Sequence, residues 1–347
     1  MKASKKNNNN NISYKNLGIQ ILRMILSFWI VLDHCLAKPI KNQFIFVFKN
    51  RLHVPCFILI SYFFSNRTIS GRNCIKIKKR FERLLIPYLI LPIVIFIINR
   101  LCFLFFKITL FGSIFTLYDL IVQFIIGRKI IDVLWFQCYL IWTTLLFVII
   151  SFLAKEKYLF IFEHIYLISY ILRYSNFNYD FFYKYNPLIR YSIAQFVEVM
   201  PMSVSGSVIA SLNIIPIIRK NVIKSIYFCC FGLYIIFNFN IFSNVKLFGF
   251  GGIILDIGSI LLFIIFFLIP FNDIKSSVFK NIIFQITNFT QGIYIFHLLI
   301  QNMLNSKFNS IKNGYFSGCI IIYIITYFIS FIGEKLTKKT KLVYLFI

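Results

Sequence analysis

Arg23 and His34 are the residues whose types and spacing first suggest chemistry, because both lie in one apolar stretch, Leu17 to Ala37. Ionisable side chains at membrane depth are costly and usually serve a function. On an α-helix their spacing advances about 16 Å and turns about 20° past three full turns, so the two side chains are predicted to share one helix face. A cation near one membrane surface and a proton-transfer group near the other suit a reaction that spans the bilayer. The alternative is a helix with a snorkelling Arg and an interfacial His.

The composition places the chain among polytopic helical membrane proteins. Of its 347 residues, 59% are hydrophobic and 14% are charged, whereas a soluble domain has about 25% charged residues. Runs such as Leu84–Ile98 and Ile253–Ile269 have no polar face. The net charge of +26 raises the question of nucleic acid, but the basic residues lie between apolar spans and form no aromatic-basic binding module. Positive cytoplasmic loops explain the charge better.

A scan for apolar segments long enough to cross a bilayer, with a window of about 19 residues, predicts an all-α polytopic membrane protein with about ten transmembrane helices. The expected spans are 17–37, 44–65, 84–106, 133–153, 158–174, 188–216, 225–241, 251–270, 282–304 and 315–333. The segment 108–132 is amphipathic and is expected to lie along the interface.

The distribution of Lys and Arg predicts that both termini are cytoplasmic. With that orientation, basic segments such as 66–83 and 333–341 face the cytoplasm, as the positive-inside rule requires. Residues 1–16 are then expected to form a disordered polar tail, 17–341 a transmembrane domain and 342–347 a C-terminal tail. The expected location is the plasma or inner membrane, in multi-pass form.

A second group of cations opens the third predicted span. These cations follow the spacing i, i+3, i+4, i+7, at Lys76, Lys79, Arg80 and Arg83. On a helix, residues with this spacing share one face. Arg is suited to a bidentate grip on phosphate, so the cluster could bind a phosphorylated ligand. The alternative is a positive flank that touches lipid headgroups.

Five short elements occur in one order along the chain: Arg23-x10-His34, His53-Val-Pro-Cys-Phe-Ile-Leu-Ile-Ser61, Arg80-Phe-Glu-Arg83, Leu134-Trp135-Phe136 and Gly292-Ile-Tyr294-Ile-Phe-His297. In this order they resemble the motifs of the membrane-bound acyltransferase 3 family, which O-acylates surface polysaccharides and other glycans. The resemblance runs from about residue 15 to the C-terminus, with no match over 155–250. Tyr62 and Leu298 depart from it, since the family usually has Gly after Ser61 and often Pro after the late His.

The resemblance implies that acyl-CoA is a co-substrate on the cytoplasmic side, that no cofactor is bound, and that acetyl is the group transferred. The acceptor would be a hydroxyl of a cell-surface glycan or lipid-linked saccharide. Acyl transfer needs a base for the hydroxyl proton, and His is the usual base near pH 7, which points to His34. The cations of the third span, Arg80 and Arg83 with Lys79 and Lys76, would bind the CoA phosphates. Arg23 would guide the donor arm between those phosphates and His34.

Three aromatic residues are candidates for supporting roles. His297 and Tyr294 are one turn apart, and would orient the acceptor or pair with His34, unless both belong to an interfacial belt. Trp135 would stack on the donor or the sugar, unless it is an interface anchor.

Acidic residues inside apolar segments are further candidates. Glu198 precedes Met200-Pro-Met-Ser-Val-Ser-Gly206, where a broken helix would line a cavity. Asp256 and Glu163-His164 are candidates of the same kind. Asp33, next to His34, projects about 100° away on the helix and is no obvious partner for it. The sequence contains no Gly-x-Ser-x-Gly, Walker loop, zinc-ligand spacing or dinucleotide fingerprint.

The sequence is compatible with two functions of different classes. The first is an acyl-CoA-dependent O-acyltransferase. The second is a transporter or exporter of a saccharide or lipid-linked substrate, in which buried His, Glu and Asp would relay protons or bind substrate. The two motifs Arg-x10-His and Arg-x-x-Arg, together with the lack of a visible inverted repeat, favour the enzyme.

Overall fold

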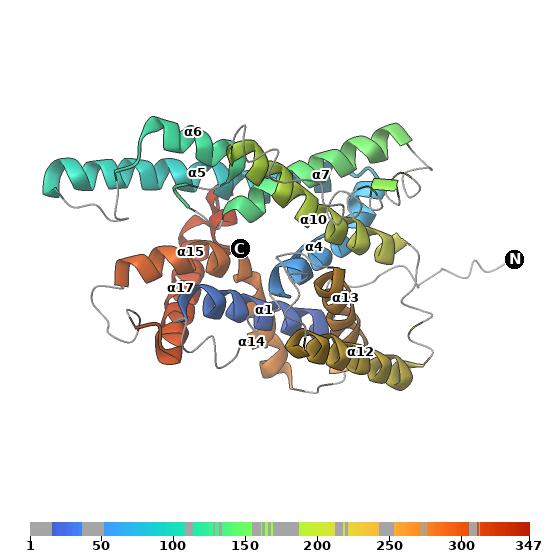
Figure 1. Ribbon diagram of the computed structural model, residues 1–347. Helices are drawn as coiled ribbons and strands as arrows, with labels where there is room; N and C mark the ends of the chain where they lie inside the picture. Colours follow the sequence, from blue (N-terminus) through green and yellow to red (C-terminus); the bar gives the residue numbers. More distant parts are fainter. Residues whose placement is uncertain are drawn as a thin grey trace, which may run out of the picture.

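The computed structural model describes residues 16–36, 52–107, 114–127, 129–131, 134–154, 161, 164–165, 168, 187–211, 218, 221–242, 253–271, 274, 276–304, 311 and 313–347. Over these residues the chain is helical and has no strand, which confirms the predicted fold class (Figure 1). The elements are α1 (Leu17–Cys35), α4 (His53–Ser70), α5 (Cys74–Phe106), α6 (Leu117–Ile126), α7 (Trp135–Ala154), α10 (Pro187–Ser211), α12 (Val222–Phe242), α13 (Ile253–Leu268), α14 (Ser277–Asn288), α15 (Thr290–Leu304), α17 (Phe316–Thr337) and the 3-10 helix η6 (Lys341–Leu345).

Several of these helices have the length and composition of membrane spans. Among the described residues, α1, α5, α7 and α17 each qualify, and α14 with α15 makes a fifth if the bent pair is one span. The helices α4, α10, α12 and α13 coincide with predicted spans, but do not meet that criterion over the residues described. The predicted span 158–174 falls largely outside the described residues. About ten spans with cytoplasmic termini therefore stay a prediction.

Helix α1 lies at the centre of the helical packing, in contact with α4, α13, α14, α15 and α17 (Figure 1). Its N-cap residue, Asn16, accepts a hydrogen bond from the Ile19 N–H (3.1 Å) and donates one to the Phe267 carbonyl of α13 (3.2 Å). A Cβ at Gly18 would collide with the Phe266 carbonyl oxygen, so only Gly lets the two helices approach this closely. The cap that begins α1 thus also fixes it against α13.

Helix α5 begins at Cys74, well before the predicted span at residue 84, so the cation cluster belongs to the same helix as the apolar segment. Asn73 starts it by accepting a hydrogen bond from the Lys76 N–H (3.0 Å). Its 33 residues make a rod of about 50 Å, longer than the roughly 30 Å hydrocarbon core of a bilayer. The first turns can therefore carry their cations outside the apolar core while the later turns span it.

The prediction of one helix over 282–304 is wrong, because α14 and α15 meet at 58° around Phe289. No Pro or Gly stands at the bend. The hydroxyl of Thr287 donates to the Ile283 carbonyl (2.9 Å), and the hydroxyl of Thr290 donates to the Thr287 carbonyl (3.0 Å). Such back-bonding by Thr competes with the helical ladder and bends helices.

The expected helix break at Met200–Gly206 is also wrong, because α10 continues from Pro187 to Ser211 with Pro201 inside it. Gly206 has a packing role instead. A Cβ at this position would collide with the Leu59 carbonyl oxygen of α4 and lie 3.0 Å from the Phe63 nitrogen. The segment thus joins two helices closely.

Replacing Gly206 with Val should therefore separate α10 from α4 and destabilise the fold by about 1–3 kcal/mol, because backbone atoms cannot move aside as a side chain can. Gly232→Val is the matched control, since a Cβ there meets only the end of the Leu261 side chain. Thermal unfolding in detergent measures both variants. Equal stability of the two variants would contradict the close approach of α10 and α4.

Candidate functional site

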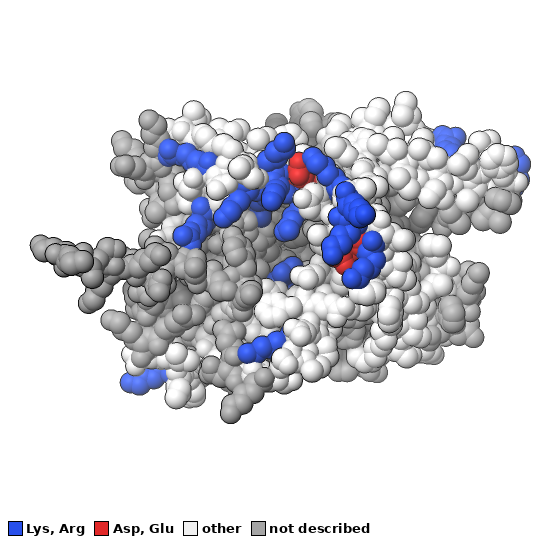
Figure 2. Space-filling model, turned by 180° about the vertical axis from the view of Figure 1, so that it is seen from behind, with Lys and Arg blue, Asp and Glu red and all other residues white. Residues whose placement is uncertain are grey.

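A cavity of about 640 Å³ lies where α1, α4, α5, α7 and the α14–α15 bend meet. Figure 2 shows Lys and Arg side chains gathered around a hollow on one face of the molecule. Among the described residues, five cations line the cavity: Arg23, Lys76, Lys79, Arg80 and Arg83. The rest of the wall is mostly apolar or aromatic, from Ile30, Val54, Phe57, Ile60, Phe64, Leu84, Phe136, Leu140, Phe284 and Tyr294. The cavity thus combines an anion-binding part with a chamber for an apolar group.

The predicted common face of Lys76, Lys79, Arg80 and Arg83 is confirmed, since all four side chains line this one cavity from α5. Their hydrogen bonding divides them into two kinds. Lys76 and Lys79 are exposed, and their side chains form no hydrogen bond or ion pair with any residue the structure describes. Arg80 and Arg83 differ from each other.

Arg80 is held by three hydroxyl groups. Its Nε donates to Thr144 Oγ1 (3.1 Å), one Nη donates to Ser61 Oγ (3.1 Å), and the other donates to Ser65 Oγ. Its Cζ lies 5.0 Å from the centroid of the Tyr62 ring. Every nitrogen of this guanidinium therefore has a protein partner, and the side chain joins α5 to α4 and α7.

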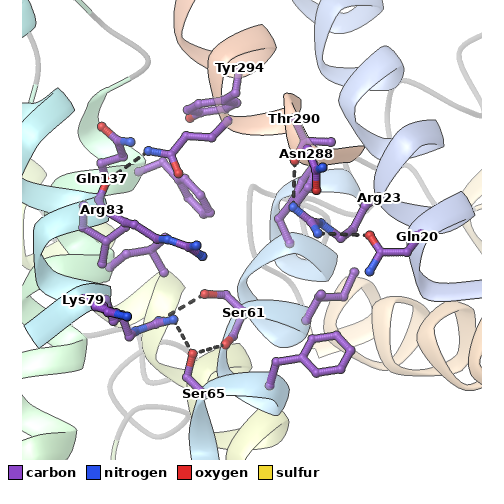
Figure 3. Close-up of a pocket in the computed structure, with 18 of the residues that line it drawn as sticks. Gln20, Arg23, Ser61, Ser65, Lys79, Arg83, Gln137, Asn288, Thr290 and Tyr294 are labelled. Carbon is purple, nitrogen blue, oxygen red and sulfur yellow. Dashed lines mark hydrogen bonds between the residues drawn. The ribbon is translucent and has the colours of Figure 1, made fainter. Parts of the chain in front are cut away.

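Arg83 extends into the cavity without a hydrogen bond from its guanidinium to any described residue. Figure 3 shows Arg83 entering from α5 and Arg23 entering from the opposite side. The planar fork of Arg83 is available to an anion in a way that the fork of Arg80 is not. The sequence predicts the same role for both Arg residues, whereas the structure gives their guanidinium groups different hydrogen bonding.

Arg23 is anchored at the bend between α14 and α15. Its guanidinium donates to Gln20 Oε1 (3.1 Å), to the Thr287 carbonyl (3.2 Å) and to Thr290 Oγ1 (2.9 Å), as Figure 3 shows in part. The Thr287 carbonyl is among those that the end of a helix leaves without an intrahelical partner. The cation thereby gives this carbonyl a further donor, beside the Thr290 hydroxyl.

His34 and His297 lie side by side, with ring centroids 5.2 Å apart. The side chain of His34 is exposed, and that of His297 is fully buried. His297 Nδ1 is 2.7 Å from the Tyr294 carbonyl and 3.2 Å from the Ile293 carbonyl. Because carbonyls only accept, Nδ1 is the donor in these contacts. Nε2 has no hydrogen-bond partner among the described residues.

The shared face of Arg23 and His34 is confirmed by a common neighbour, because Arg23 bonds to Thr290 and His34 contacts His297, both on α15. Neither His belongs to the cavity wall as described. Tyr294 connects the two sites. It lines the cavity, and its ring centroid is 5.4 Å from that of Phe136 and 6.2 Å from that of His297.

The other predicted residues lie apart from this arrangement. Trp135 is buried beside Tyr139 (ring centroids 6.2 Å apart), although the two residues that follow it, Phe136 and Gln137, line the cavity. Asp256 is buried near the start of α13, and His164 is exposed; neither lines the cavity. Glu198 lies on α10, with its side chain outside the described part, and Glu163 lies outside the described residues altogether.

Sequence reasoning missed a carboxylate–imidazole contact beside His34. Asp33 Oδ2 is 3.8 Å from His53 Nε2, and both side chains are largely buried. The ring of Trp29 lies 5.8 Å from that of His53. Helical geometry correctly predicts that Asp33 points away from His34. Asp33 faces His53 instead, the first residue of the segment His53 to Ser61. The resemblance of that segment to a family motif was the only sequence signal that could have pointed to His53.

Comparison with known proteins gives one match. The family model described as an acyltransferase domain, that of the acyltransferase 3 family, matches residues 16–335. The matched range includes the cavity and both histidines, and it ends before η6. No match was found among curated proteins or among solved structures.

The division between Arg80 and Arg83 predicts different costs for the same substitution. Arg80→Lys should destabilise the ligand-free protein by about 1–3 kcal/mol, because one ammonium cannot reproduce the hydrogen bonds to three hydroxyls. Arg83→Lys should change stability by less than about 0.5 kcal/mol. Thermal unfolding without ligand compares them, and equal losses would show that Arg80 does not join the helices.

Proposed function

The chain belongs to the acyltransferase 3 family, whose model spans residues 16–335, and on this basis we propose that it transfers an acyl group, acetyl in the simplest case, from acyl-CoA to a hydroxyl of a glycan or lipid-linked saccharide. Family membership and the long apolar helices make it a membrane acyltransferase. The observation that carries the finer proposal is a cavity with five described cations that reaches Tyr294, one turn before the histidine pair.

The proposed phosphate ligands are the cavity cations whose side-chain nitrogens form no hydrogen bond with any described residue. Lys76 and Lys79 are exposed, and Arg83 extends into the cavity beside them. CoA carries a pyrophosphate and a 3′-phosphate, which suit two point charges and one planar fork. Arg80 would act on the donor indirectly, because its nitrogens are already bonded to Ser61, Ser65 and Thr144. This changes the role assigned from the sequence, where Arg80 binds phosphate directly.

The apolar wall is the proposed path of the pantetheine arm. Phe57 and Ile60 of α4 and Phe136 of α7 line the same cavity as the cations. Arg23 stands at the α14–α15 bend, where a cation can hold the thioester carbonyl. Cytoplasmic entry of the donor agrees with the predicted orientation, because Arg23 and Arg83 both lie near the starts of their helices and face one cavity.

His34 is the proposed base. The acceptor hydroxyl oxygen attacks the thioester carbonyl carbon while His34 takes the hydroxyl proton. The C–S bond then breaks, the new ester bond is formed, and His34 returns the proton to the CoA thiolate. The exposed side chain of His34 is open to an acceptor, and the ring of His297, 5.2 Å away, would orient that acceptor. Neither His lines the cavity, but Ile30, one turn before His34, and Tyr294, one turn before His297, both do, so the donor arm would extend past these residues to reach His34.

A transporter is the second candidate, because α14 and α15 are a discontinuous helix pair of the kind that binds substrate in secondary transporters. Purified protein supplied with acetyl-CoA and a panel of glycans separates the two functions. The enzyme should release free CoA only when an acceptor is present. Transport of the glycan into vesicles without any CoA release would overturn the acyltransferase proposal.

His34→Ala should lower turnover by about 10²–10⁴-fold, the contribution typical of a general base, while the dissociation constant for acyl-CoA changes less than about twofold. His297→Ala should lower turnover less, since it orients and does not accept the proton. The control is His164→Ala, an exposed His outside the site. Turnover within a few-fold of wild type for His34→Ala would remove His34 from the mechanism.

Arg83→Gln should raise the KM for acyl-CoA about ten- to a hundredfold, because a charge-assisted phosphate bond is worth roughly 1.5–3 kcal/mol. Arg83→Lys should recover part of that loss. Arg100→Gln is the matched control, because Arg100 lies on the same helix and is not part of the cavity wall. If Arg83→Gln and Arg100→Gln have the same KM, the cation cluster is only a topology signal.

A further inference from the structure

The 3-10 helix η6 and the residue after it, Phe346, pack against the turns of α5 that carry the cavity cations, and against α17. The sequence assigns residues 342–347 to a tail, whereas the structure packs them into the helical body. From these contacts we propose that Tyr344 and Lys341 are positioning residues of the donor site, which keep Arg83 and its neighbouring cations available to an anionic ligand. This inference rests on the proposed acyl-CoA site.

Tyr344 restrains Arg83 directly. The guanidinium carbon of Arg83 lies 5.9 Å from the centroid of the Tyr344 ring, a distance at which a cation is attracted to an aromatic face. The amide of Gln291 donates to the Arg83 carbonyl (3.1 Å) and to the Tyr344 carbonyl (3.4 Å). Gln291 itself lines the cavity. Arg83 is therefore oriented by the ring of Tyr344, while its N–H groups are left for an anion.

Lys341 pairs with the acidic residue that stands among the cavity cations. Its Nζ lies 2.6 Å from Glu82 Oε1, and this hydrogen bond raises the pKa of the Lys341 ammonium. Both groups are near the surface, where an ion pair adds little to stability. The ion pair matters more for the charges beside the cavity, because it occupies the Glu82 carboxylate. Glu82 is also within electrostatic reach of Lys78 and Lys79, so without Lys341 its carboxylate would be left to these two cations, of which Lys79 is a proposed donor ligand.

The C-terminal segment is fixed to the other wall of the cavity as well. The ring of Phe346 stacks on Phe296 of α15, with centroids 5.6 Å apart. A Cβ at Gly333 of α17 would collide with the Phe346 ring, and a Cβ at Gly292 would lie 2.7 Å from its carbonyl oxygen. These two glycines form a slot that only a chain without Cβ atoms provides. The segment thus ties α5, with the cations, to α15, with Tyr294 and His297.

The position of this segment relative to the family match is also informative. The matched range ends at residue 335, so Lys341, Tyr344 and Phe346 lie beyond the part of the chain that the family model describes. Their contacts reach back to Glu82, Arg83 and Gln291, which lie inside it. The proposed role therefore joins residues on both sides of the end of the matched range.

The first experiment measures acyl-CoA kinetics of Tyr344→Ala, Tyr344→Phe and Leu342→Ala. Tyr344→Ala should raise KM for acyl-CoA about two- to fivefold, the loss expected from one cation–π contact, with kcat within twofold of wild type. Tyr344→Phe keeps the ring and should keep KM. Leu342→Ala shortens an exposed side chain of the same segment and should change neither constant.

The second experiment tests the charge effect at Lys341 and Lys339, which are exposed, and at Glu82, whose side chain is partly buried. Lys341→Ala should raise KM about two- to fivefold at low salt, and Lys339→Ala, which removes the same charge from an exposed position nearby, should not. Adding Glu82→Gln to Lys341→Ala should return KM to within twofold of wild type. A merely structural role would give no such rescue.

Three results would decide between the possibilities. An active wild type with unchanged KM in Tyr344→Ala and Lys341→Ala would overturn the positioning role. A lower unfolding temperature without a change of KM would also overturn it, and would leave the segment as a fold-stabilising element only. A wild type that neither binds nor consumes acyl-CoA would instead defeat the proposed function, which a direct binding measurement on the wild type detects first.

Discussion

The contact between Arg23 and the bend of α14 and α15 is the constraint on which the rest of the site depends. An Arg in an apolar helix must find acceptors, and a carbonyl freed by a helix break must find a donor. Here each satisfies the other, through the Thr287 carbonyl and the Thr290 hydroxyl. Because α15 begins at that point, its direction also sets where Tyr294 and His297 lie. Removing the cation would therefore disturb the cavity wall and the histidine pair together.

Hydrogen-bond satisfaction also separates residues of the same type. Arg80 and Arg83 are one turn apart on α5, but three hydroxyls surround the first, and a Tyr ring alone contacts the guanidinium of the second. A guanidinium that is fully bonded within the protein stabilises the wall, whereas one that is not keeps its donors for a ligand. A shared motif and a shared helix face therefore do not imply a shared role.

The sequence predicts what depends on helical periodicity. The common faces of Arg23 with His34, and of Lys76 with Arg83, follow from residue spacing alone, and the main helices overlap the predicted spans, although α4, α5 and α17 extend past them. The bend at Phe289 could not be predicted, because it has no Pro or Gly and arises from Thr back-bonding together with a distant Arg. At Pro201 the error is the reverse: the sequence suggests a broken helix, but α10 is continuous through this residue. Contacts between remote segments, such as Asp33 with His53, have no periodic signal.

Under the proposed function, the separation between the cavity and the two histidines would keep the donor away from the base. A thioester held beside a base and open to water would be lost to hydrolysis before an acceptor arrived, and enzymes avoid such loss by excluding water from the reactive group. In this structure Phe136 and Tyr294 line the cavity with their rings 5.4 Å apart, and His34 lies outside the cavity wall with an exposed side chain. The proposed base is thus separate from the proposed donor site. Since Tyr294 stands one turn from His297 on α15, a shift of that helix would move the cavity wall and the histidine pair together.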